Sequence, residues 1–247
     1  CNSFCTFCII PYGRGPARSL PIDVIVDQVN ALEKGGAKEV ILTGTNIGHF
    51  GHEWSESFVP GKPLADLVAA LVRETDIPRI RISSLDPLEL CDEIFEVFEA
   101  SQGRLCPHFH VSLQSPHSEI LKKMKRKYRF EVVEQCLTTL SNLKDPLSGL
   151  NPFVGMDVIS GFPGESPEIF EWTREVLSRL YWSRLHVFPY SERSGTPAAK
   201  MKESVDPRVR KQRARGLIDL SIERLQDQSQ KRLKAPFDDV LIEGPSR

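Results

Sequence analysis

The chain of 247 residues has no apolar run that approaches the roughly 20 residues needed to cross a bilayer. No signal-peptide pattern precedes the first cysteine, so we expect a soluble protein with no membrane partner. The sequence also lacks an excess of one charge, because 32 Lys and Arg face 33 Asp and Glu. That balance argues against a wholly basic nucleic-acid binder, while 40% hydrophobic residues suffice for one large folded core.

Cysteine is sparse as well. The chain has six cysteines, whereas secreted disulfide scaffolds are usually shorter and denser in cysteine. We therefore expect a reduced, cytoplasmic setting. The chain begins with Cys rather than Met, so we expect it to be part of a longer protein. Half of the cysteines, Cys1, Cys5 and Cys8, lie within the first eight residues.

Short β-branched apolar runs alternate with stretches of helical periodicity along most of the chain. Five strands are predicted, at residues 39–44, 79–84, 108–114, 152–160 and 184–190. Strands that alternate with helices predict an α/β fold with a parallel sheet. An arc of such units is a partial (β/α) barrel, whose chemistry lies where strands end and loops begin. We call residues 1–8, with their three cysteines, the cysteine loop. In such a fold this loop would follow a first strand upstream of Cys1, and that strand is not contained in this sequence.

The pattern changes near residue 204. We expect a core domain over residues 1–204 and a basic helical extension or linker, rich in solvent contacts, over residues 205–235. Residues 236–247 are predicted to begin a further β module that is truncated here.

Three interpretations of the cysteine spacing remain open. A structural zinc site needs four ligands and would have to borrow His49 or His52. A disulfide with a spare thiol fits a reduced compartment poorly. An iron–sulfur cluster takes thiolate ligands, and three cysteines for four irons would leave one iron open to a substrate or cofactor.

The CxxxCxxC spacing, with Phe7 before the third cysteine, resembles the signature of radical S-adenosylmethionine enzymes. The resemblance implies that Cys1, Cys5 and Cys8 hold a [4Fe-4S] cluster. It also implies that S-adenosyl-L-methionine binds the fourth iron, in a full or partial (β/α) barrel of the radical SAM type.

Further motifs resemble the methylthiotransferases of this superfamily, in the same order over residues 1–200. They are CTFCIIPYGRG (5–15), LTGTNIGHFG (42–51), RIRISSLDP (79–87), LQS (113–115), DVISGFPGE (157–165) and LHVFPYSERSGTPAAKM (185–201). They most resemble the branch that 2-methylthiolates N6-threonylcarbamoyladenosine in tRNA, next to the anticodon. Alternatives are isopentenyladenosine in tRNA, a ribosomal-protein aspartate or, in another class, a non-catalytic zinc-stabilised RNA-binding module.

The resemblance implies more than this sequence contains. Family members carry a second [4Fe-4S] cluster in an N-terminal domain, and residues 236–247 would begin a TRAM-like RNA-binding barrel. We also expect tRNA as a partner, a flavodoxin-type or ferredoxin-type electron donor and a monomeric chain. Pro116 departs from the family pattern.

The resemblance assigns cofactor contacts to Phe7, Thr43, Gly44, Thr45, Gln114, Gly161 and Val187, with no catalytic residue beyond the cluster ligands. Turn formation explains the glycines equally well. The basic stretches 122–129 and 208–216 are candidates for phosphate contacts. The predicted tRNA-binding residues are Arg14, Arg18, Lys122, Lys123, Lys125, Arg126 and Lys127.

Overall fold

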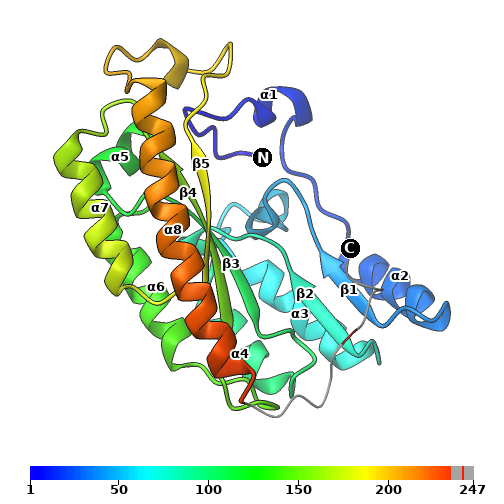
Figure 1. Cartoon of the computed structure of the whole chain (residues 1–247). Helices are drawn as coiled ribbons and strands as arrows, with labels where there is room; N and C mark the ends of the chain where they lie inside the picture. The colour runs from blue at the N-terminus through cyan, green and yellow to red at the C-terminus, as the bar shows by residue number, and fades with distance from the viewer. Residues whose placement is uncertain (235–240, 242–247) are drawn as a thin grey trace.

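The computed structural model describes residues 1–234 and residue 241, and it contains five parallel strands in that range (Figure 1). The strands are β1 (Glu39–Leu42), β2 (Arg79–Ile82), β3 (His108–Gln114), β4 (Phe153–Ser160) and β5 (Arg184–Pro189). Each lies within a predicted strand. The predicted start of a β module at residues 236–247 lies, apart from residue 241, outside the described residues.

The strands follow chain order. β1 pairs with β2, and β3, β4 and β5 form a second parallel sheet. Isolated bridges from Ile80 to Leu105 and from Leu85 to Val111 connect β2 to the β3 side. The described strands form an open arc rather than a closed barrel, which confirms the predicted α/β fold and partial barrel.

Helices connect the strands and lie alongside them in Figure 1. They are α1 (Ile10–Arg14), α2 (Ile22–Lys34), α3 (Lys62–Glu74), α4 (Asp92–Ala100), α5 (Ser118–Lys123), α6 (Phe130–Asn142), α7 (Pro167–Arg179) and α8 (Pro207–Arg232). In α3, Leu64, Leu67, Val68 and Leu71 are buried, as their helical spacing predicts. No helix among the described residues has the length and apolar character needed to cross a membrane.

Strand β3 shows how the sheet presents two faces. Phe109, Val111 and Leu113 are buried in the main core, while the alternate residues are only half-buried. Such alternation follows from strand geometry, in which successive side chains point to opposite faces. On the half-buried face, His110 Nε2 lies 2.9 Å from an oxygen of Asp157 on β4.

Helix α8 packs against β5 and β4, and the hydroxyl of Ser221 accepts the Leu185 N–H at 2.9 Å. Most of the helix is exposed, but the expectation of a solvent-rich helix is wrong at Arg210 and Arg213, which are buried. Arg213 donates to the Glu165 carboxylate at 2.7 Å, and Arg210 donates to Glu192 at 2.6 Å. Buried guanidinium groups need such partners, so these two side chains face acids on the sheet side of the helix.

Candidate active site

The cysteine loop lies over the carboxyl ends of β4 and β5 in Figure 1, next to α5. Thr6 fixes it there: its N–H donates to the Met124 carbonyl at 3.1 Å, and its hydroxyl donates to the Lys123 carbonyl at 2.8 Å. Its own carbonyl accepts the Ala198 N–H at 2.9 Å. The loop is therefore held from both neighbouring segments at the rim where barrel chemistry is expected.

Phe7 anchors the same loop. Its ring packs edge-on against Phe162, with centroids 6.3 Å apart, in a small apolar cluster that also contains Met124 and Tyr190. The structure therefore gives Phe7 a packing role. Its predicted cofactor contact stays a prediction.

Cys5 receives a cationic hydrogen bond. Arg126 Nη1 donates to Cys5 Sγ at 3.2 Å, and Arg126 also pairs with Asp86 and donates to Tyr128 Oη at 3.1 Å. Burial raises the pKa of the Cys5 thiol, while the charge and hydrogen bond of Arg126 oppose that rise. A guanidinium beside a buried sulfur favours its thiolate form, which is the form that ligates iron.

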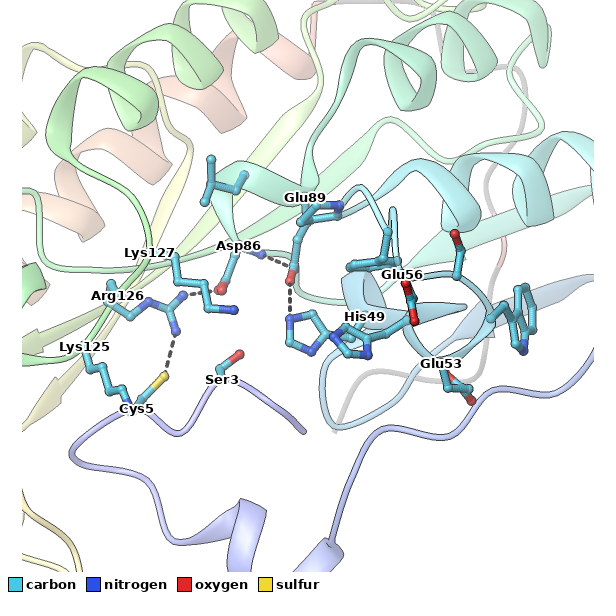
Figure 2. A pocket seen from close by; sticks show the side chains of 16 residues that line it. Ser3, Cys5, His49, Glu53, Glu56, Asp86, Glu89, Lys125, Arg126 and Lys127 are labelled. Carbon is cyan, nitrogen blue, oxygen red and sulfur yellow. Dashed lines mark hydrogen bonds and ion pairs between the residues drawn. The ribbon is translucent and has the colours of Figure 1, made fainter.

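A polar cavity of about 640 Å³ opens beside Cys5, and we call it the Cys5 cavity (Figure 2). It lies among the short 3-10 turns η1 (Ile47–His49), η2 (His52–Trp54) and η3 (Pro87–Glu89) and the turn that follows α5. Its charged and imidazole side chains are His49, His52, Glu53, Glu56, Asp86, Glu89, Lys125, Arg126 and Lys127. Its lining also includes the apolar side chains of Trp54, Phe58, Pro60 and Leu88, so the cavity suits a ligand that combines polar or charged groups with an apolar part.

His49 and Glu89 are the buried pair of this cavity, 7% and 2% exposed. Burial, with the charge of Asp86, raises the pKa of Glu89 to about 7. Burial, with the charge of Lys127, lowers the pKa of His49 to about 4. Both groups are therefore largely neutral near pH 6, and their 3.7 Å contact is not an ion pair at that pH.

A second cavity, of about 460 Å³, is lined by Cys1 but not by Cys8, which lines neither cavity, and we call it the Cys1 cavity. Thr43, Gly44 and Thr45 line it together with Cys1. The predicted RNA contacts Arg14 and Arg18 line the same cavity, and His49 lines both cavities. The structure thus brings together the loop after β1 and the cysteine loop, as a cofactor site at the barrel rim requires.

Three other predicted cofactor residues line neither cavity. Gln114 ends β3 with φ of 64°, in the left-handed region that few non-glycine residues adopt. Gly161 has φ of 73°, and a Cβ there would lie 2.4 Å from the Arg210 side chain, so α8 packing already requires glycine. Val187 packs against the main core. Their contacts with a cofactor stay predictions.

The three cysteines of the loop supply thiolates, the kind of ligand that an iron–sulfur cluster takes. Among residues 1–234, no three His, Cys, Asp or Glu side chains are grouped around one point. A [4Fe-4S] cluster takes its thiolates on separate irons, so Cys1, Cys5 and Cys8 need not converge on one point.

The predicted RNA-binding cations differ in their surroundings. Lys122, Lys125 and Lys127 are exposed and form no ion pair with any residue from 1 to 234. Lys123 pairs with Glu203, and Arg126 is buried against Asp86 and Cys5. Within residues 1–234 these three lysines, like the exposed Arg14 and Arg18, can meet an anion without breaking an ion pair.

Sequence reasoning missed Asp86 and Glu89 and gave Arg126 a different role. A signal for the first two was present, because Asp86-x-x-Glu89 follows a strand with the spacing of a capping box. The structure forms that box at η3, with the Asp86 N–H donating to Glu89 at 2.8 Å. The contact of Arg126 with Cys5 spans 121 positions, which no local pattern reveals.

The sequence model of the Radical SAM superfamily matches residues 1–177. The chain is 43% identical over 220 residues to the threonylcarbamoyladenosine tRNA methylthiotransferase MtaB of Rickettsia prowazekii, covering 87% of this chain and 49% of that protein. It is 39% identical over 243 residues to the protein of the same name from Bacillus subtilis, covering 98% and 51%. It is 36% identical over 249 residues to the tRNA-2-methylthio-N(6)-dimethylallyladenosine synthase of Alkaliphilus oremlandii, covering 100% and 50%. The chain thus spans about half the length of these curated relatives.

Solved structures agree on the fold. The radical S-adenosylmethionine methyltransferase TsrM from Kitasatospora setae superposes with a TM-score of 0.61 at 17% identity, over 81% of this chain and 37% of that one. The coproporphyrinogen III oxidase HemN from Escherichia coli gives 0.59 at 18% identity, over 91% and 50%. At such identities the likeness shows the architecture alone. The cysteine loop, the partial barrel and the match of the superfamily model over residues 1–177 together show that the chain belongs to the radical SAM superfamily.

Proposed function

We propose that this chain is the radical-generating core of a cytoplasmic enzyme that 2-methylthiolates N6-threonylcarbamoyladenosine in tRNA, next to the anticodon. The observation that carries the proposal is the three-cysteine loop, fixed at the strand ends beside two cavities. The names and identities of the two threonylcarbamoyladenosine relatives support the substrate branch.

Cys1, Cys5 and Cys8 would hold the cluster, and Thr43, Gly44 and Thr45 would contact S-adenosylmethionine in the Cys1 cavity. When bound, the cluster supplies the electron for reductive cleavage of S-adenosylmethionine. The protein orients the bound cluster and S-adenosylmethionine and shields them from solvent. Arg126 stabilises the Cys5 thiolate, and the Thr6 contacts hold the loop in place.

The proposal includes partners that lie outside this chain. These are tRNA, a flavodoxin-type or ferredoxin-type electron donor and a second [4Fe-4S] cluster in another domain of the whole protein. We also propose that the protein acts as a monomer.

Anaerobic reconstitution of the whole protein, followed by mass spectrometry of tRNA nucleosides, tests the activity. We expect 2-methylthio-N6-threonylcarbamoyladenosine from the wild type and none from Cys5→Ala. The present chain alone, loaded with iron and sulfide and reduced, should release 5′-deoxyadenosine without modifying tRNA. Modification of isopentenyladenosine or of a ribosomal protein instead would contradict the substrate branch, and tight zinc without cleavage would contradict the enzyme class.

A further inference from the structure

The Cys5 cavity contains an imidazole nitrogen that lacks a partner. His49 Nδ1 is buried and makes no hydrogen bond within the described part of the chain. A buried polar atom left unpaired costs free energy, and a ligand that reaches it recovers that cost. The backbone beside His49 packs closely against Glu89, since a Cβ at Gly48 would lie 2.1 Å from the Glu89 side chain.

Opposite walls of this cavity carry opposite charges. Figure 2 shows Lys125, Arg126 and Lys127 on one side, Glu53 and Glu56 on the other, and His49 between them. Arg126 is already paired with Asp86, so the two lysines at the rim supply the free positive charge on their side. A ligand that bears an anion at one end and N–H or O–H donors elsewhere matches this arrangement.

The two tRNA nucleosides named by the relatives differ in this chemistry. A threonylcarbamoyl group on N6 carries a carboxylate, a hydroxyl and the N–H and C=O groups of a urea. A dimethylallyl group consists of hydrocarbon. Placing the hydrocarbon here would leave His49 unpaired and would desolvate the lysines, whereas the threonylcarbamoyl group offers partners to both.

We propose that the Cys5 cavity is the specificity pocket for the threonylcarbamoyl group, with Lys125 and Lys127 at its carboxylate and His49 at its urea or hydroxyl. This inference rests on the proposed function. The volume of about 640 Å³ exceeds what this substituent needs, which leaves room for the adenine beside Cys5. A site that hydrogen-bonds a substrate group can discriminate against an analogue that lacks this group by about 10⁴-fold in kcat/KM.

The test measures kcat/KM of the whole, cluster-loaded enzyme on two tRNAs, one with N6-threonylcarbamoyladenosine and one with dimethylallyladenosine. For the wild type we expect a preference for the first. Lys127→Met and Lys125→Met should each lower kcat/KM on that tRNA roughly tenfold, mainly through KM, and shrink the preference. Lys127→Arg keeps the charge and should retain most of the wild-type value.

Lys122→Met is the matched control, since Lys122 is an exposed lysine on α5 outside the Cys5 cavity. It should change both tRNAs by the same factor. Circular dichroism and iron content establish that each variant is folded and loaded with its cluster.

The outcomes separate the two proposals. If the wild type methylthiolates both tRNAs equally, or if the Lys127→Met loss is equal on both, the pocket assignment is overturned while the proposed function stands. If the wild type modifies neither tRNA although it cleaves S-adenosylmethionine, the proposed function fails and the pocket assignment fails with it.

Discussion

A single side chain, that of Arg126, connects the cysteine loop to the sheet. It is 7% exposed and reaches Cys5, Asp86, Tyr128 and the Ser112 carbonyl. The Asp86 side chain is 18% exposed, and its partial burial raises the pKa of that carboxyl while Arg126 opposes the rise. Removing one partner of such a pair leaves an uncompensated buried charge.

We predict that Arg126→Met lowers the free energy of unfolding by about 3 kcal/mol at neutral pH, because Asp86 loses its partner. Urea denaturation of the apoprotein measures this. The variant should also lose iron faster after reconstitution, since Cys5 loses its cationic donor. Arg129→Met, at an exposed position three residues on, is the control and should stay within about 0.5 kcal/mol of the wild type. A stable, fully iron-retaining Arg126→Met would refute the role given to this side chain.

Glu89 makes stability depend on pH. Its pKa is raised from 4.5 to about 7, so the folded chain holds the proton more tightly than the unfolded chain. The resulting stabilisation is complete below pH 4.5 and is lost as pH rises through 7, and it amounts to about 3 kcal/mol. The Glu89→Gln variant has no such loss. Between pH 5 and pH 8 the unfolding free energy of the wild type should therefore fall relative to that of the variant.

Urea titrations at a series of pH values measure that difference. Glu96→Gln, at an exposed site on α4, should give a constant offset from the wild type across the same range. If the unfolding free energies of Glu89→Gln and the wild type changed in parallel with pH, the pKa of Glu89 would not be raised in the folded chain.

The short turns η1 and η3 pack closely against each other. Gly48 in η1 faces Glu89 in η3, and an added Cβ would lie 2.1 to 2.4 Å from three atoms of the Glu89 side chain. Glu89 cannot move aside freely, because it is buried and accepts the Asp86 N–H. Glycine is therefore needed at position 48 for space.

Gly48→Ala should lower the free energy of unfolding by about 2 kcal/mol through overpacking. The combination with Glu89→Ala should cost less than the sum of the single variants, because the shorter side chain makes room. Thermal or urea unfolding of the wild type, the two single variants and the double variant measures this double-mutant cycle. Gly13→Ala serves as the control, since a Cβ there meets nothing within 4 Å. Strict additivity would mean that the two turns do not constrain each other.

The regular elements follow from local sequence, whereas the packing of the turns against one another does not. Apolar periodicity places all five strands, and it places α3 because its buried residues recur at helical spacing. The turns η1 and η3 depend instead on a contact between Gly48 and Glu89, 41 positions apart in sequence. The same holds for the buried arginines of α8, whose acid partners lie on distant loops. Local patterns predict a helix there but not which charges turn inward.

At the scale of the whole molecule, the cysteine loop, the two cavities and the free lysines lie at the same end of the sheet. The family resemblance assigns the cysteines and the loop after β1 to one site, and in the structure Cys1 and that loop line the same cavity. The sequence could not distinguish cations available to tRNA from cations already paired, since pairing depends on tertiary contacts such as Lys123 with Glu203.

That distinction gives a prediction for tRNA binding by the whole protein. Lys122 and Lys123 are neighbours on α5, but Lys122 is free among the described residues and Lys123 is paired with Glu203. If this surface binds tRNA phosphates, Lys122→Met should reduce the slope of log affinity against log salt by about 0.7 to 0.9, one phosphate contact. Lys123→Met should change the slope little, because the wild-type ammonium is already neutralised. Filter binding or fluorescence anisotropy across a salt series measures both slopes. Slopes equal to the wild-type slope in both variants would place tRNA on another face of the molecule, since the free lysine would then make no phosphate contact.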